Sequence, residues 1–240
     1  MTARRHLFVA GLVWVVLSAI SMVLVAGVQV LPDVASHEAE IEDDAFVLLT
    51  VVSIPVLWFV VVALAYSAIR FRARPDETAD GPPIHGHRGF QAGWLAVTFA
   101  MVIGLFVYGA IGLVEIRGVQ SADFEVHVRA EQWKWHYTYP NGLVSEDLHL
   151  PVDRRVHLVL ESDDVIHSLW LPALGVKQDV VPGRVTEAYT TPTVTGTYGG
   201  RCAELCGFGH TGMTTTFDVE DESTLEVWMN QEEPESTDGS

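Results

Sequence analysis

The sequence predicts two or three membrane-spanning helices followed by an all-β domain outside the membrane. Long runs without any charged residue fill the first half of the chain, and short strand-like segments broken by Pro, Gly, Asn and Asp begin after Glu115. The 240 residues are 49% hydrophobic, yet the formal net charge is −17. This acidic balance argues against nucleic-acid binding, which needs a basic surface to displace counterions from phosphate.

Three uncharged runs are long enough to cross a bilayer, whose hydrocarbon core needs about 20 apolar residues per helix. They are Leu7–Leu31, Ala45–Ile69 and Ala92–Val114. The alternative, helices buried on all sides in a large soluble core, is disfavoured because the rest of the chain is too small to cover three of them. The second and third runs predict a transmembrane helical hairpin over residues 45–114, surrounded by membrane lipid.

Charged residues beside these runs predict the orientation in the membrane. Arg4 and Arg5 precede the first run, and the 70–91 segment holds four more arginines, whereas the 32–44 segment has six acidic residues and no Lys or Arg. Basic loops stay on the cytoplasmic side. We therefore expect a multi-pass protein of the cell membrane with the N-terminus and the 70–91 loop inside. An acidic 32–44 loop and everything after Val114 would lie on the external side.

Residues 1–44 combine the first apolar run with this acidic external loop, and the run has two interpretations. It follows an arginine pair, as a signal peptide does. It is also longer than the usual apolar core of a signal peptide, about 7–15 residues, and no sharp cleavage site follows it. A retained membrane helix is favoured, and the external position of the later domain is the same under either interpretation.

Residues 115–231 have the pattern of an all-β sandwich or barrel. Runs rich in Val, Thr, Tyr and Trp predict five strands: Phe124–Ala130, Trp133–Tyr139, Arg155–Glu161, Arg184–Thr190 and Thr214–Val219. Pro140–Gly142 predicts a turn, and residues 172–184, which are rich in turn formers, predict a loop. We expect a terminal helix over residues 221–230 and a disordered acidic tail over residues 232–240.

A cluster of soft metal ligands lies near the end of this domain. Cys206, His210 and Met213 fall within eight residues, and thiolate, imidazole and thioether are the ligands that suit copper. Cys202 supplies a second thiol four residues before Cys206. Two thiolates on one short loop can bridge two metal ions, so the pattern predicts a dinuclear copper centre.

Two alternatives compete with copper at this cluster. A Cys202–Cys206 disulfide would persist outside the cytoplasm, but it does not explain a His and a Met at ligand spacing just downstream. Zinc also binds Cys and His, but Met is a poor zinc ligand. A further histidine is needed from elsewhere, and His167, at the head of an apolar strand, is favoured. The remaining strand histidines are expected to be solvated or ordinary barrel residues: His127, His136, His149 and His157.

Three blocks of sequence resemble subunit II of the haem–copper oxidases, the cytochrome c oxidase subunit that carries the CuA centre. They are Q-W-K-W-H-Y-T-Y-P at 132–140, D-V-I-H-S-L-W-L-P-A-L-G-V-K-Q-D-V-V-P-G-R at 164–184, and C-A-E-L-C-G-F-G-H-T-G-M at 202–213. With the membrane hairpin, the resemblance covers most of residues 45–230. It implies a transmembrane hairpin followed by a cupredoxin, which is a Greek-key β-barrel.

The resemblance also implies a ligand set for the metal centre. Its members are His167, Cys202, Glu204, Cys206, His210 and Met213. The cysteines would bridge two coppers, each histidine would bind one copper, and the methionine would be a weak axial ligand. The glutamate would lend its backbone carbonyl to the other copper, and its side chain would reach a magnesium or manganese ion shared with subunit I.

The aromatic block has one structural and one functional interpretation. Trp133, Trp135, Tyr137 and Tyr139 are spaced by two, so an ideal strand places them on one face. For most of them this predicts a core stripe of the barrel. Trp133 matches the position at which, in the family, an electron enters from the donor.

Together these features predict the electron-accepting subunit of a respiratory terminal oxidase. It would take electrons from an external cytochrome c or blue copper protein and pass them to haem in subunit I, where oxygen becomes water. The alternatives are the same centre in another respiratory complex, such as a nitric oxide reductase, and a membrane-tethered copper chaperone.

From Glu115 onward there are 22 acidic and 8 basic residues. Such self-repulsion is tolerated best at high salt and indicates a halophilic source.

Overall fold

The computed structural model describes residues 3–28, 31–72, 86–118 and 121–231. The chain divides into two compact units. One comprises Met1–Val30 with Ala45–Ile111, and the other comprises Leu31–Asp44 with Gly112–Ser240. The predicted tail over residues 232–240 and most of the predicted 70–91 loop lie outside the described residues.

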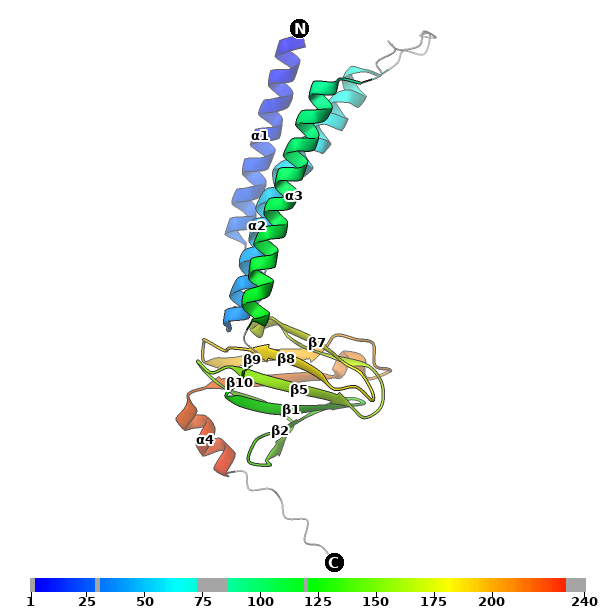
Figure 1. The fold of residues 1–240 in the computed structure, drawn as a ribbon. Coiled ribbons are helices and arrows are strands. Elements are labelled where there is room, and N and C mark those ends of the chain that lie inside the picture. The colour runs from blue at the N-terminus through cyan, green and yellow to red at the C-terminus, as the bar shows by residue number, and fades with distance from the viewer. Residues whose placement is uncertain (1–2, 29–30, 73–85, 119–120, 232–240) are drawn as a thin grey trace, which may run out of the picture. The chain divides into compact units, whose positions relative to one another are not determined.

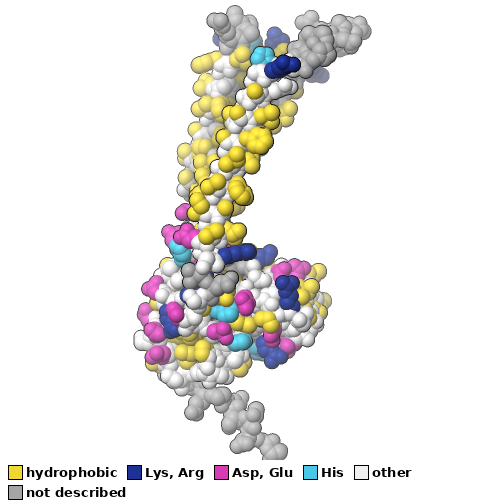
Figure 2. Space-filling model, in the orientation of Figure 1, with side chains coloured by type: hydrophobic (Ala, Val, Ile, Leu, Met, Phe, Trp, Pro, Cys, Tyr) yellow, Lys and Arg dark blue, Asp and Glu magenta, His cyan; other side chains and the backbone are white. Residues whose placement is uncertain are grey.

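Three long apolar helices occupy the N-terminal part of the described chain (Figure 1). They are α1 (Ala3–Gly27), α2 (His37–Arg70) and α3 (Arg88–Arg117). All three are long and apolar enough to cross a membrane, with mean hydropathies of 2.6, 2.8 and 2.3 in their most apolar windows, and almost none of those residues is buried. Figure 2 shows hydrophobic side chains covering the helices, whereas charged side chains gather on the β domain.

Helices α1 and α2 are joined by two hydrogen bonds from tryptophan side chains. The Trp14 indole donates to the Pro55 carbonyl oxygen at 2.8 Å, and the Trp58 indole donates to the Ser21 hydroxyl at 2.8 Å. Polar contacts of this kind contribute to helix association where lipid surrounds the helices.

The acidic 32–44 segment is not a loop throughout, so that prediction is wrong from residue 37 onward. Helix α2 begins at His37, and the Ser36 hydroxyl caps it by accepting the Ala39 N–H at 3.0 Å. Glu38 and Glu40 lie in the first turn, where negative charge is stabilised by the helix dipole. The predicted apolar run starts at Ala45, after these charges, although acidic residues suit the first turn of a helix.

This acidic segment packs onto the β domain. The Ala35 N–H donates to the Ala173 carbonyl at 2.8 Å, and the Ala35 carbonyl accepts the Thr193 N–H at 2.8 Å. Glu38 is 1% exposed, and its side chain forms an ion pair with Arg155. The segment is therefore a structural part of the β unit.

Two five-stranded sheets form the β domain, with strand orders β3-β2-β1-β5-β8 and β4-β10-β9-β6-β7. The β1–β5 and β4–β10 pairs are parallel and the other pairs are antiparallel. The strands are β1 (Phe124–Glu131), β2 (Lys134–Thr138), β3 (Val144–Ser145), β4 (Leu148–Pro151), β5 (Val156–Ser162), β6 (His167–Leu171), β7 (Val176–Val180), β8 (Thr186–Thr190), β9 (Gly196–Cys202) and β10 (Thr214–Glu220).

One apolar core lies between the sheets. Buried and exposed residues alternate along β1 and β5, as expected for strands with one face on a core. Leu158 and Leu160 from the first sheet and Leu171 and Phe217 from the second are fully buried in the same cluster. The alternation confirms the all-β expectation, and the same buried cluster contains Cys202, Cys206 and Met213.

The five predicted strands are present with shifted ends, and β6 is the apolar strand expected to begin at His167. Four strands were not predicted: β3, β4, β7 and β9. The predicted loop over residues 172–184 is wrong, because it contains β7. A short 3₁₀ turn, Pro172–Leu174, ends at Gly175 with φ 63°, and β7 starts directly after it. Turn formers therefore flank a short strand whose end residues, Val176 and Val180, are buried. The predicted turn at 140–142 and the terminal helix, α4 (Glu222–Gln231), are confirmed.

Candidate metal centre

Neighbouring strands of the second sheet bring the predicted ligands together. His167 is the first residue of β6, and Cys202 is the last residue of β9, which pairs with β6. Cys206 follows in the loop after β9, His210 begins a short 3₁₀ helix (His210–Gly212), and Met213 precedes β10. Because β9 and β10 also pair, the Cys202 N–H donates to the Met213 carbonyl at 2.9 Å.

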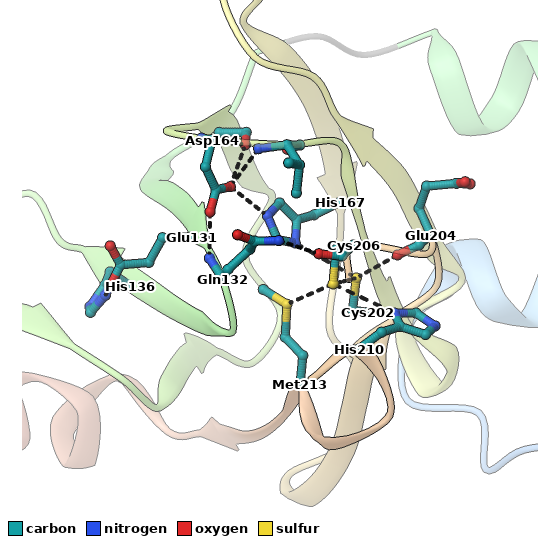
Figure 3. A network of polar contacts seen from close by, with 12 residues as sticks. Glu131, Gln132, His136, Asp164, His167, Cys202, Glu204, Cys206, His210 and Met213 are labelled. Carbon is teal, nitrogen blue, oxygen red and sulfur yellow. Dashed lines mark hydrogen bonds and ion pairs between the residues drawn. The ribbon is translucent and has the colours of Figure 1, made fainter. Parts of the chain in front are cut away.

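The side chains of these five residues converge on one point (Figure 3). The two sulfur atoms of Cys202 and Cys206 are 3.8 Å apart. Nδ1 of His167 lies 3.9 Å from the Cys202 sulfur, and Nδ1 of His210 lies 3.6 Å from the Cys206 sulfur. The Met213 sulfur is 3.7 Å from the Cys206 sulfur. The two thiols thus lie between the two imidazoles, and the thioether is beside one thiol.

Glu204 contributes its backbone to this cluster and not its side chain. Its carbonyl oxygen accepts from the Cys202 thiol at 3.2 Å, whereas its carboxylate is exposed. The geometry is compatible with the carbonyl role implied by the resemblance.

The cysteines are both free and both buried. Their separation of 3.8 Å is far longer than the 2.03–2.05 Å of a disulfide bond. Ligand atoms of His167, Cys202 and Cys206 all lie within 4.8 Å of one another. Two thiols, two imidazoles, a thioether and a carbonyl form a soft, sulfur-rich donor set that fits copper better than zinc.

Burial makes the Cys206 thiol reluctant to ionise without a metal. Burial, together with the neighbouring Cys202 thiol, raises the pKa of Cys206 to about 11. A thiol must lose its proton to become a metal ligand. Metal binding at this site therefore displaces protons from a pocket that disfavours bare thiolate charge.

Asp164 orients His167 and was not identified from the sequence. Its carboxylate accepts from Nε2 of His167 at 2.9 Å. Burial raises the pKa of Asp164, but hydrogen bonds from His167, Val165 and Gln132 outweigh this effect and hold the pKa below its usual value. Metal-bound histidines commonly donate their second N–H to a carboxylate. The only sequence signal was an acidic residue three positions before the histidine.

Gln132 links the Trp133 segment to the ligand segments and was also missed. Its backbone N–H donates to Asp164 at 2.7 Å, and its side-chain amide donates to the Cys206 carbonyl at 2.7 Å (Figure 3). No spacing rule singles out this glutamine, since both partners lie more than 30 residues away in the sequence.

The aromatic block divides as expected between core and surface. Trp135, Tyr137 and Tyr139 are buried, with exposed fractions of 2%, 0% and 3%. Trp133 is 39% exposed, and β2 begins one residue after it. The core-stripe prediction is confirmed for the three buried residues, and Trp133 lies at the surface beside the ligand loop.

The remaining strand histidines do not approach the centre. Each pairs with a glutamate, at 3.1 Å for His127, 3.1 Å for His136, 3.4 Å for His149 and 2.9 Å for His157. Their assignment as ordinary barrel residues is therefore confirmed.

Comparison with known proteins identifies the family. The family model for the periplasmic domain of cytochrome c oxidase subunit II matches residues 142–219. Cytochrome c oxidase subunit 2 of Synechocystis sp. is 30% identical to this chain, over 95% of the chain and 83% of the relative. The chain belongs to the cytochrome c oxidase subunit 2 family.

Other members of the cytochrome c oxidase subunit 2 family show similar agreement. The protein of Thermostichus vulcanus is 29% identical over 86% of this chain and 80% of its own length. The crystal structure of the periplasmic domain of subunit II of cytochrome oxidase from Bradyrhizobium japonicum is 31% identical. It covers 47% of this chain and 95% of that domain, with a TM-score of 0.45.

Membership of the cytochrome c oxidase subunit 2 family confirms several expectations. The chain is a subunit of an oxidoreductase, it acts with other oxidase subunits, and its family binds copper. It is a membrane protein with an external domain. Its apolar helices followed by a cupredoxin-like β domain confirm the predicted fold class.

Proposed function

We propose that this chain is the electron-accepting subunit of a respiratory haem–copper oxidase. It takes single electrons from an external cytochrome c or blue copper protein at a dinuclear CuA centre. It then passes them to haem in subunit I, where oxygen is reduced to water. The observation that carries the proposal is the pair of free, buried thiols 3.8 Å apart, with a histidine beside each.

His167, Cys202, Cys206, His210 and Met213, with the carbonyl of Glu204, would hold the metal. When bound, copper held by these residues would supply a one-electron redox couple. The protein contributes rigidity, because His167 and Cys202 lie on paired strands and the Cys202 N–H donates to the Met213 carbonyl. His167, both cysteines and Met213 are buried, so the site excludes water from most of the ligand set. A rigid, dry site favours electron transfer because little rearranges when the charge changes.

The surface beside the centre suits a soluble redox partner. Trp133 is partly exposed, and the ligand loop presents the apolar side chains of Leu205 and Phe208 at 77% and 101% exposure. An exposed indole offers a flat, polarisable contact at low entropic cost. The acidic residues that dominate this domain would attract a basic donor and accelerate its encounter.

The location and the second metal are further parts of the proposal. The arginine-rich flanks and the acidic 32–44 segment support a cell-membrane protein whose copper domain faces the external side. The Glu204 carboxylate, which is exposed, would bind a magnesium or manganese ion together with subunit I.

A copper chaperone is the rival of a different class. A chaperone needs an open thiol pair that releases copper readily. Here Cys202 and Cys206 are 5% and 3% exposed, and Asp164 holds His167 from behind. These features favour a permanently bound copper centre over a chaperone site. Among respiratory complexes, the alternative is the same centre in a nitric oxide reductase.

The test uses the purified full-length chain, loaded with copper in detergent and mixed rapidly with reduced cytochrome c. We expect one electron per chain to be taken up, with matching bleaching of the copper absorption, and no uptake by Cys202→Ser. Failure to accept electrons, combined with fast loss of copper to a copper(I) chelator, would contradict the proposal and favour the chaperone.

A further inference from the structure

The backbone conformation of Gly209 does not require a glycine. Its φ and ψ are −85° and 6°, values open to any residue. By contrast, Gly207 in the same loop has φ 120°, a conformation that side chains rarely adopt. Neighbouring atoms, and not the backbone conformation, therefore explain why position 209 has no side chain.

The surroundings of Gly209 are the indole ring of Trp133. A Cβ atom built on Gly209 would lie 2.4 Å from Cδ2, 2.7 Å from Cγ and 2.8 Å from Cε3 of Trp133. Real Cβ atoms essentially never come within 3.0 Å of another heavy atom in this way. The indole therefore fills the volume that a side chain at position 209 would occupy.

Trp133 has little freedom to move away from this contact. The preceding residue, Gln132, is held by hydrogen bonds to Asp164 and to the Cys206 carbonyl, both at 2.7 Å. The Cβ of any residue at position 207 would in turn meet the Gln132 amide at 2.8 Å. The indole is thus pressed onto the stretch of loop between two ligands, Cys206 and His210.

We propose that Gly209 is a positioning residue for electron transfer. By lacking a side chain, it seats the Trp133 indole in direct contact with the loop that carries Cys206 and His210. This inference rests on the proposed function, because the seat matters only if electrons enter through Trp133. Its structural half, the fit of the indole onto position 209, can be tested without any metal.

The structural test is a double-mutant cycle in the metal-free, full-length protein. Gly209→Ala should lower the thermal unfolding midpoint by several degrees, because overpacking forces the indole out of its place. Gly212→Ala is the matched control, since it lies in the same loop and nothing is within 4 Å of its added Cβ. In a Trp133→Ala background, Gly209→Ala should have no such effect. If Gly209→Ala does not fold alone, the Trp133→Ala double variant should restore folding.

The functional test uses the copper-loaded full-length chain and reduced cytochrome c. Gly209→Ala should slow electron uptake about tenfold or more, with copper content and electron paramagnetic resonance spectrum unchanged. Gly212→Ala should match the wild type, and Gly209→Ala should add nothing to Trp133→Ala.

Two results would overturn the inference about Gly209, and a third would overturn the proposed function alone. Equal behaviour of Gly209→Ala and Gly212→Ala in both tests would overturn the inference. So would an equal loss of thermal stability from Gly209→Ala with and without Trp133, since the clash would then lie elsewhere. A wild-type chain that accepts no electrons would defeat the proposed function, while the metal-free cycle would still decide whether position 209 seats the indole.

Discussion

Nε2 of His167 lies 2.9 Å from the carboxylate of Asp164, so the opposite ring nitrogen, Nδ1, faces the thiol of Cys202. His167 is fully buried, and its orientation is fixed by this bond. The carboxylate therefore selects which nitrogen is available to a metal.

Replacing Asp164 by alanine should weaken copper binding roughly 10- to 100-fold, as expected when a carboxylate behind a ligand histidine is lost. Competition with a copper chelator measures the change. Asp163→Ala is the matched control, because Asp163 is exposed and pairs with Arg129. Equal affinities of the two variants would show that Asp164 does not orient His167.

Replacing Trp133 by alanine should slow electron uptake from reduced cytochrome c and leave the copper spectrum unchanged. Trp133 is not a ligand, and donor affinity should change little because exposed acidic residues provide the attraction. Stopped-flow measurements at several donor concentrations separate the rate from the affinity.

Trp135→Ala is the contrast to this variant. Trp135 is 2% exposed, so its truncation should cost about 3–5 kcal/mol of unfolding free energy. If Trp133→Ala merely unfolds the domain, or transfers electrons at the wild-type rate, then electrons enter elsewhere.

Replacing Glu38 by alanine should destabilise the β domain by about 3–5 kcal/mol, because it leaves the Arg155 charge largely buried without its partner. Glu38 also accepts the Thr191 N–H at 2.7 Å, and Arg155 donates to the Ile116 carbonyl at 2.9 Å. Urea unfolding measures the loss. Glu40 lies in the same helical turn but is exposed, so Glu40→Ala should hardly change the free energy of unfolding. A similar loss of stability in both variants would exclude a specific role for the Glu38–Arg155 pair.

The metal-free protein should lose stability as the pH rises from about 9 to about 11. Burial, together with Cys202, raises the pKa of Cys206 from an ordinary value of 9.0 to about 11. The buried thiol thus stays neutral in the folded state, while the same thiol in the unfolded chain ionises first. Its contribution is fully present below pH 9 and is lost as the pH passes through 11. Cys206→Ser should show a shallower decline in unfolding free energy over this range, and an unchanged slope would contradict the raised pKa.

Local patterns in the sequence predicted most of the fold and the part of the site whose ligands are close together in the chain. Uncharged runs revealed the helices, and the spacing of Cys206, His210 and Met213 revealed a ligand cluster because these residues are close in the chain. Pairing of β6 with β9 brings His167 to that cluster, and strand pairing is not visible in a single sequence. Its assignment therefore depended on context and on family resemblance.

The features that were missed depend on tertiary contacts. β7 is a short strand between turn residues, and its place in the sheet comes from pairing with β6. The start of α2 was missed because the sequence alone indicates an exposed loop for Glu38. Its burial depends on the ion pair with Arg155, which is more than 100 residues away in the sequence. Gln132 likewise acquires its role only through its distant hydrogen-bond partners.

The number of copper ions bound by the purified full-length chain decides whether the two thiols hold a dinuclear centre. We expect two coppers per chain, a purple oxidised form, and a mixed-valence electron paramagnetic resonance signal that is lost in Cys202→Ser. A stoichiometry of one copper, or a preference for zinc over copper, would contradict the dinuclear centre.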